Sequence, residues 1–234
     1  MALHIFNTDL LHSTRPLVVG AVSTEATLRQ LAEKPLTTDD CDLLELRLDL
    51  IALPAEEVLS LSEKLGLPLL ITARHPEEGG QGNLDVAQRS ALLEALLPKA
   101  ALIDIEVRSA PEMLGLIRKA QARKVQVVGS FHDFHNTPSV DVLRGAVDFG
   151  LQCRLNAIKL ATYLRGPEDI GRLVEVIATE KRAPLSVMGM GELGKVSRLL
   201  LAKCGSVLNY GYLGEANAPG QWPARRLKEL LADL

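Results

Sequence analysis

Residues 43–49 read LLELRLD, with a charged residue at every second position. Alternation with a period of two puts Glu45, Arg47 and Asp49 on one face of a β-strand and Leu44, Leu46, Leu48 and Leu50 on the other. If the strand belongs to a barrel, the leucine face meets the surrounding helices and the charged face points inward. Burying these charges unpaired would cost several kcal/mol each, so we expect them to pair with one another or with a ligand.

Other short apolar runs resemble this stretch and bring the number of strand candidates to eight. A short, mostly apolar run is typical of a parallel strand that is buried on both faces. The candidates follow one another at intervals of about 25–30 residues, close to a minimal β/α unit. They are Leu17–Val22, Leu43–Asp49, Leu69–Arg74, Leu102–Val107, Val125–His132, Ala157–Thr162, Pro184–Met190 and Val207–Leu213.

Helix signals lie between these strands. Residues 166–169, GPED, place a proline and two acids at a helix start, and Lys181 and Arg182 are expected in that helix's last turn, where they suit its dipole. Residues 109–112 and 137–138 predict two further helix starts. Alternating strands and helices favour an α/β fold.

No linker, low-complexity tract or change in composition divides the 234 residues. We therefore predict a single (β/α)8 TIM barrel that spans residues 1–234. A doubly wound open sheet is the main alternative. Its glycine-rich nucleotide-binding turn is missing after the first strand, where residues 20–23 read GAVS.

Charged residues also interrupt the other strands, namely at Arg74, Asp104, Glu106, His132 and Lys159. A structural ion-pair lattice inside the barrel would explain any one of them. Five of the eight strands carry such residues, and active sites of this fold lie at the carboxyl ends of the strands. The pattern therefore favours an active site.

Lys159 is the most informative of these residues, because it stands among apolar neighbours in the sixth strand. Apolar surroundings and nearby arginines both lower a lysine pKa and free the amine as a nucleophile. His132 on the preceding strand is a candidate proton shuttle. Together with His135 it could also suggest a metal pair, but no third ligand is evident and we assign no metal.

The composition limits the choice of partners and compartment. The net charge is −3 and no basic run is present, so neither nucleic acid nor an acidic membrane surface is expected as a partner. Three widely spaced cysteines suit a reducing compartment. The sequence has no basic leader and no apolar run near the ~20 residues of a membrane span, so we expect a cytoplasmic protein. We also expect a homodimer.

Two glycine-containing loops complete the pattern. Residues 188–194, MGMGELG, lead into a helix and could cradle an anion with backbone amides, with Arg198 completing the site. Residues 215–221, EANAPGQ, follow the last strand and predict a loop at the barrel mouth that closes over the substrate.

Taken in order, these motifs resemble the type I 3-dehydroquinate dehydratases of the shikimate pathway. The resemblance runs from Val18 to Gln221 and is carried by seven segments in register: ELRLD at 45–49, RHPEEGG at 74–80, DIE at 104–106, SFHDF at 130–134, IK at 158–159, SVMG at 186–189 with SR at 197–198, and APGQ at 218–221. Each segment alone is modest, whereas seven in register are specific.

The resemblance implies a (β/α)8 barrel without a metal or organic cofactor, acting on 3-dehydroquinate. It implies that Lys159 forms a Schiff base with the substrate ketone, that His132 is the general acid and base, and that Glu78 orients His132. The implied substrate-binding residues are Glu45, Arg47, Arg74, Arg198, Asn217 and Gln221.

One position departs from the family pattern. Four residues before Gln221 the family usually has a serine, where this chain has Asn217. An amide can still donate a hydrogen bond to a carboxylate, so we expect function to survive.

Two other functions fit part of the pattern. A sugar-phosphate aldolase would also use a Schiff-base lysine and would suit the glycine-rich loop, but not the charged triplet at 45–49. A non-catalytic barrel that senses a metabolite would bind substrate without turnover.

Overall fold

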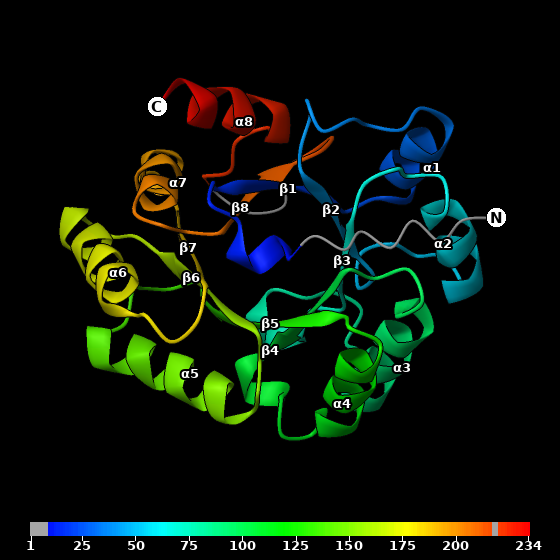
Figure 1. The fold of residues 1–234 in the computed structure, drawn as a ribbon, viewed down its shortest axis with the longest axis horizontal. Helices are drawn as coiled ribbons and strands as arrows, with labels where there is room; N and C mark the ends of the chain where they lie inside the picture. The colour runs from blue at the N-terminus through cyan, green and yellow to red at the C-terminus, as the bar shows by residue number, and fades with distance from the viewer. Residues whose placement is uncertain (1–8, 217–219) are drawn as a thin grey trace.

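The computed structural model describes residues 9–216 and 220–234 and shows eight parallel strands in one sheet. From β1 to β7 each strand pairs with the next along the chain, and β8 pairs with β1 (Figure 1). The strands are β1 (Leu17–Val22), β2 (Leu43–Arg47), β3 (Leu69–Thr72), β4 (Leu102–Glu106), β5 (Gln126–Asp133), β6 (Ala157–Tyr163), β7 (Leu185–Met190) and β8 (Leu208–Tyr212). The predicted barrel is confirmed.

The seam between β7 and β8 closes this barrel with few hydrogen bonds. The backbone amide of Val207 donates to the carbonyl of Leu185 at 2.9 Å. The Ser186 hydroxyl donates to the carbonyl of Leu208 across the same seam. Side-chain hydrogen bonding therefore supplements the backbone pairing at the point where the sheet meets itself.

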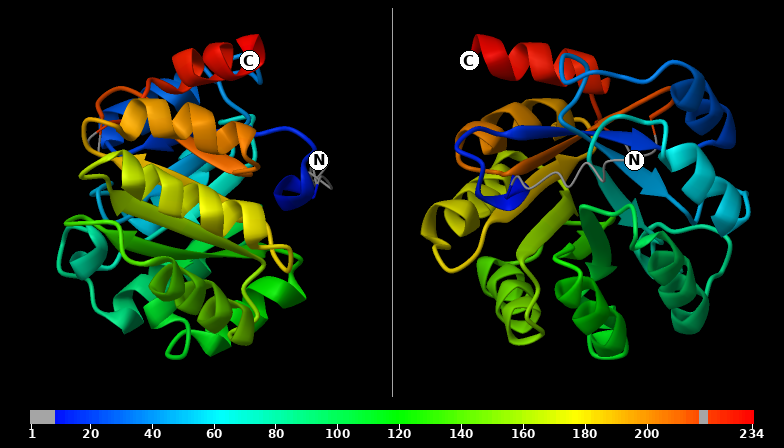
Figure 2. Two further views of the ribbon diagram at one scale, coloured as in Figure 1. Left: turned by 90° about the vertical axis from the view of Figure 1, so that its left-hand side faces the viewer. Right: turned by 45° about the vertical axis from the view of Figure 1, so that its right-hand side comes forward.

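A ring of helices surrounds the strands (Figures 1 and 2). The α-helices are α1 (Glu25–Glu33), α2 (Ala55–Ser62), α3 (Val86–Leu96), α4 (Leu114–Ala122), α5 (Val140–Gln152), α6 (Pro167–Thr179), α7 (Gly194–Lys203) and α8 (Ala224–Asp233), with short 3-10 helices η1 (Leu10–His12), η2 (Pro76–Glu78) and η3 (Val107–Ser109). Side chains of Thr24, Asp85 and Ser139 cap the amino ends of α1, α3 and α5.

Three expectations about element ends were wrong. Helix α6 ends at Thr179, so Lys181 and Arg182 follow it, because Glu180 takes an extended conformation and its carboxylate binds Arg182. Residues 107–109 form η3, and α4 begins only at Leu114. Asp49 lies in a turn after β2 rather than on the strand.

Apolar side chains fill the two sides of the strands unequally. The outward residues, such as Leu44 and Leu46 of β2, pack against the helices in one large buried cluster. The inward residues form a smaller apolar cluster that includes Leu43 and also Leu10 and Leu11 of η1. Figure 2 shows η1 at one end of the barrel. The apolar plug therefore fills the amino end and leaves the next inward layers for polar residues.

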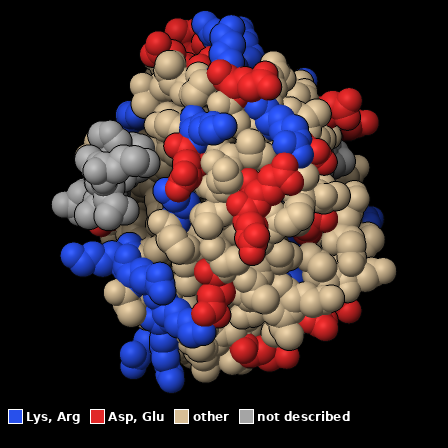
Figure 3. All heavy atoms as spheres, turned by 90° about the vertical axis from the view of Figure 1, so that its right-hand side faces the viewer, with Lys and Arg blue, Asp and Glu red and all other residues tan. Residues whose placement is uncertain are grey.

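The surface carries both signs of charge. Figure 3 shows one face on which acidic and basic side chains are both present. None of the helices in the described part of the chain combines the length and the apolarity needed to cross a lipid bilayer.

Candidate active site

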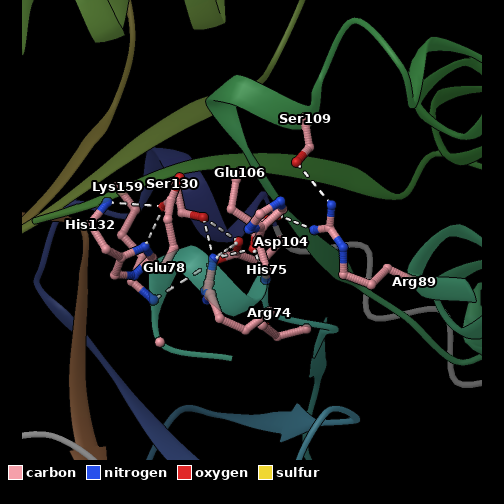
Figure 4. Close-up of polar contacts among 12 residues, drawn as sticks. Arg74, His75, Glu78, Arg89, Asp104, Glu106, Ser109, Ser130, His132 and Lys159 are labelled. Carbon is pink, nitrogen blue, oxygen red and sulfur yellow. Dashed lines mark hydrogen bonds and ion pairs between the residues drawn. The ribbon is translucent and has the colours of Figure 1, made fainter. Parts of the chain in front are cut away.

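The inward layers above the apolar plug hold a cluster of charged residues (Figure 4). In β2 the inward sequence runs from Leu43 to Glu45 and then Arg47, so the polarity changes along one face of the strand. The same change occurs in β4, where Leu102 precedes Asp104 and Glu106. The strand alternation therefore delivers charge to the carboxyl half of the barrel interior.

Lys159 projects into this interior from β6 and is 5% exposed. Its Nζ lies 3.7 Å from Oδ2 of Asp104 and 3.9 Å from the centre of the Tyr210 ring. Burial lowers the pKa of this lysine, while the carboxylates of Glu45 and Asp104 oppose that effect. The net effect is a lowered pKa, so this buried amine loses its proton more readily than a lysine in water.

His132 and Glu78 form a pair beside Lys159. Nδ1 of His132 lies 2.9 Å from Oε2 of Glu78, and the His132 backbone amide donates to the same oxygen at 3.0 Å. Glu78 reaches this place from η2, the turn that follows β3. The bond at Nδ1 fixes the ring and leaves Nε2 for proton transfer.

The protonation of this pair follows from its burial. Burial and the nearby cations of Arg74 and Lys159 hold the pKa of His132 well below 6.5. Burial also raises the pKa of Glu78 to about 7, although Arg74 opposes that shift. The imidazole is therefore neutral near neutral pH and able to accept a proton.

Arg74 stands at the centre of the charged cluster. One of its nitrogens donates to Asp104 Oδ1 at 2.8 Å and to Glu106 Oε1 at 2.9 Å. The same nitrogen donates to the Ser130 hydroxyl, and the second nitrogen reaches Asp104 Oδ2 at 3.0 Å. The guanidinium thus forms ion pairs with two buried carboxylates on β4.

Arg89 completes this network, and the sequence analysis did not predict its role. It lies on α3, is 1% exposed, and donates to Glu106 Oε2 and to the Ser109 hydroxyl at 3.0 Å. A signal was available, because Arg89, Leu93 and Leu96 follow a spacing of four and then three residues on the buried face of α3. Glu106 is therefore held between two arginines, one inside the barrel and one outside.

Replacing Arg89 by leucine is expected to destabilise the fold by about 3 kcal/mol, because it breaks a buried ion pair and leaves Glu106 with one cation fewer. Urea unfolding measures the change. Arg118 on α4 is exposed, so Arg118→Leu is the matched control and should stay within about 0.5 kcal/mol. Equal stability of both variants would show that the outer arginine does not hold the network.

Arg47 and Asp49 form a second ion pair at the end of β2. Nε and Nη2 of Arg47 donate to the two oxygens of Asp49 at 2.9 and 2.8 Å. Asp49 also accepts the backbone amides of Arg74 at 3.2 Å and Gln81 at 3.3 Å. Asp49 therefore ties the loop after β3 to the barrel and holds Arg47 in place.

Glu45 lies deeper in the barrel than Arg47. Its Oε1 accepts a hydrogen bond from the Thr72 hydroxyl at 2.8 Å, and the side chain is buried. It is also the strongest of the neighbouring charges that favour the protonated form of Lys159. Glu45 therefore acts on the amine through its charge.

Arg198 reaches the site from α7 and is 2% exposed. Its Nη1 donates to the carbonyl of Tyr210 at 2.9 Å, and its Nε donates to the carbonyl of Gly220 at 3.1 Å. No carboxylate within the described ranges, 9–216 and 220–234, forms an ion pair with it, and burial lowers its pKa to about 10. A buried cation of this kind is suited to a negatively charged ligand.

The glycine-rich loop before Arg198 has a packing role that the sequence reading did not anticipate. A Cβ on Gly220 would meet the carbonyl oxygen of Gly191 at 2.4 Å and the Cα of Gly194 at 2.9 Å. The amide of Gly189 donates to Ser197 at 3.2 Å and that of Gly194 to Gly191 at 3.0 Å. These two amides are used within the chain, so the glycines bring the seventh and eighth loops together rather than presenting both amides to a phosphate.

Known proteins resemble this chain in sequence and in fold. The chain matches the family model of type I 3-dehydroquinases over residues 18–234. The chain belongs to the type I 3-dehydroquinase family. The resemblance inferred from the sequence motifs is thereby confirmed.

Individual dehydroquinases show how far the likeness extends. A 3-dehydroquinate dehydratase of Thermodesulfovibrio yellowstonii is 36% identical over 186 residues, which cover 77% of this chain and 80% of the relative. That of Methanococcoides burtonii is 30% identical over 223 residues, covering 93% and 94%. The crystal structure of the enzyme from Geobacillus kaustophilus superposes with a TM-score of 0.86 at 28% identity and covers 95% of this chain and 92% of that one.

In this dehydroquinase the barrel brings together most of the residues that the motifs indicated. Lys159, His132 and Glu78 adjoin one another, and Glu45, Arg47 and Arg74 lie on neighbouring strands. Arg198 and the buried Gln221 lie on the side of β7 and β8. Asn217 falls outside the described residues.

Proposed function

We propose that this family member dehydrates 3-dehydroquinate to 3-dehydroshikimate through a Schiff base on Lys159. The observation that carries the proposal is a buried lysine amine beside a neutral histidine that a carboxylate holds at Nδ1. The amine supplies a nucleophile, and the histidine supplies a base within the same enclosed space.

The reaction follows from the chemistry of an imine. The neutral amine of Lys159 attacks the ketone, and loss of water gives a protonated imine. The imine draws electrons from the neighbouring carbon, so His132 can remove a proton that an unmodified ketone would hold too tightly. The electron pair passes into an enamine.

The second half of the reaction returns that proton. The enamine pushes out the hydroxyl group on the next carbon, and the protonated His132 donates its proton so that water leaves. Water then hydrolyses the conjugated imine, which frees the Lys159 amine and releases the enone. Glu78 serves the proton transfers by orienting His132 and by stabilising its cationic form.

Substrate binding is assigned to the charged groups around this centre. We propose that Arg198 and Gln221, with Asn217, bind the carboxylate, because Arg198 is a buried cation with no ion-pair partner in the described part of the chain. Glu45 and Arg47 are proposed to bind hydroxyl groups. Arg74 belongs to the same set, and its bonds to Asp104 and Glu106 fix its place.

Replacing Arg198 by alanine is expected to raise KM about 30- to 100-fold, because it removes a charge-assisted pair with the carboxylate. The effect on kcat should be smaller, since Lys159 and His132 remain. Arg198→Lys keeps the charge but loses the fork and should fall between the two. Steady-state kinetics measures both constants, and an unchanged KM in Arg198→Ala would remove this residue from the carboxylate site.

An ultraviolet assay tests the proposed function directly. Addition of 3-dehydroquinate to the protein should produce the absorbance of a conjugated enone, and mass analysis should show loss of one water from the substrate. Tight binding without absorbance change would support a metabolite-sensing barrel instead. Cleavage of a sugar phosphate, with no enone from 3-dehydroquinate, would support an aldolase.

The cellular setting is part of the same proposal. We propose that the protein acts in the cytoplasm as a homodimer and serves the shikimate pathway, which leads to chorismate and the aromatic amino acids. Sedimentation of the purified chain tests the dimer, and a monomer at micromolar concentration would exclude a stable one.

A further inference from the structure

Tyr210 contacts the proposed nucleophile from β8, which β7 separates from the strand of Lys159, β6. It projects inward from β8 and is 3% exposed. The centre of its ring lies 3.9 Å from Nζ of Lys159, which places the amine over the ring face. A cation in this position is attracted by the negative face of an aromatic ring, and more strongly where water is excluded.

The polar end of Tyr210 does not explain its placement. Among the residues that the structure describes, its buried hydroxyl has no hydrogen-bond partner. Burial and the charges of Glu45 and Asp104 raise the pKa of this phenol well above 10, so it stays neutral. Packing in the inward apolar cluster therefore positions the ring, and the ring rather than the hydroxyl meets Lys159.

Tyr210 also connects the two halves of the site. Its backbone carbonyl accepts the hydrogen bond from Arg198 Nη1 at 2.9 Å, while its ring contacts Lys159. One residue of β8 thus contacts both the proposed nucleophile and the proposed carboxylate-binding cation. A shift of this residue would move the two groups together.

Charges of both signs surround Lys159. Glu45 on β2 and Asp104 on β4 favour its protonated form, whereas Arg74 and Arg47 disfavour it. The neutral His132 on β5 faces the same space. Asp104 is shared with Arg74, and its Oδ2 is 3.7 Å from Nζ, too far for a hydrogen bond. The Tyr210 ring is therefore a close stabilising contact that no arginine shares.

We propose that Tyr210 is a positioning residue for the reactive lysine, whose ring stabilises the positive charge on the Lys159 nitrogen as an ammonium ion and then as a protonated imine. Only the stabilisation of the protonated imine rests on the proposed function. The ring keeps the nitrogen charged during the steps in which it must draw electrons from the substrate, and it needs no proton transfer of its own.

A fluorination series separates the ring's electrostatics from its shape. Tyr210→Phe retains the ring and removes a buried hydroxyl that has no partner, so it should fold normally. Site-specific replacement by mono-, di- and trifluorophenylalanine then weakens the negative ring face in steps with little change in volume. The readout is the pKa of Lys159 in the free protein, from the pH dependence of trace acetylation by acetic anhydride at that residue, measured by peptide mass spectrometry.

The Phe variant should keep the Lys159 pKa of the native protein, and the trifluorinated ring should lower it by about one unit, a tenfold change in the protonation equilibrium. Lys195 over Trp222 gives an internal reference, since its acetylation profile should not change along the series. An unchanged Lys159 pKa throughout the series would overturn the proposal, as would an equal fall in the Phe variant. Because the titration needs no substrate, it is independent of whether the protein dehydrates 3-dehydroquinate.

Discussion

Replacing Lys159 by methionine is expected to lower kcat/KM for 3-dehydroquinate by at least about 10⁴-fold, or ~5.4 kcal/mol of transition-state stabilisation. Methionine keeps the length and the apolar stem of the side chain but has no amine, so no imine can form. Without an imine, the proton next to the ketone is too weakly acidic for His132 to remove at a useful rate. Enone formation under saturating and limiting substrate measures the loss.

The fold should survive this change. Within residues 9–216 and 220–234, Lys159 forms one ion pair, the 3.7 Å approach to Asp104, and Asp104 keeps its bonds to Arg74 and Ser130. Lys195→Met is the matched control, because Lys195 also lies over an aromatic ring but is exposed. It should retain activity within about twofold. A Lys159→Met protein that turns over at a tenth of the native rate would show that the reaction does not pass through this amine.

His132→Ala is expected to lower kcat about 10³-fold, within the range for loss of a general acid and base. Its distinguishing feature is what remains: Lys159 is intact, so the imine should still form slowly and be trapped by borohydride. In the native protein, burial lowers the pKa of His132, so the ring is neutral near neutral pH and free to accept a proton. Rapid quenching and mass analysis of the variant should show the imine accumulating without enone.

His135→Ala provides the control for this variant, since His135 lies three residues further on and is exposed. It should behave as the native protein. If His132→Ala turned over normally, the histidine would have no part in proton transfer. If it formed no imine at all, its role would lie in placing the lysine and not in the later steps.

The barrel and its polar interior could be predicted because strand alternation is a local property. In residues 44–48 a period of two separates Glu45 and Arg47 from the leucines, and each set lies on the face that the pattern indicated. Lys159 could be singled out for the same reason, as a charge inside an apolar strand. The seven segments in register then pointed to the family.

What the sequence did not reveal depends on distances between elements. Arg89 lies on α3, which packs against β3, and its buried side chain reaches Glu106 of β4 and Ser109 of η3. Tyr210 meets Lys159 across the barrel interior, and that contact depends on how eight strands close and in which register. The spacing of Arg89, Leu93 and Leu96 indicates that Arg89 is buried but does not indicate its partners, and the Tyr210 contact leaves no periodic signal.

The seventh loop shows that glycines predicted to bind an anion also have a packing role. Its glycines predicted backbone amides facing an anion. In the structure Gly191 has φ of 86°, and Gly194 lies against Gly220 of the next loop. The same residue type serves a phosphate cradle and a close backbone approach equally well. Only the position of the eighth loop distinguishes them.

Borohydride trapping tests the central claim most directly. Native protein mixed with 3-dehydroquinate and sodium borohydride should lose activity and gain the mass of a reduced substrate or product adduct, and peptide mapping should place that adduct on Lys159. The Lys159→Met variant should gain no adduct under the same conditions. Enone formation without any trapped adduct, or an adduct in the native protein on another lysine such as Lys195, would contradict the Schiff-base assignment.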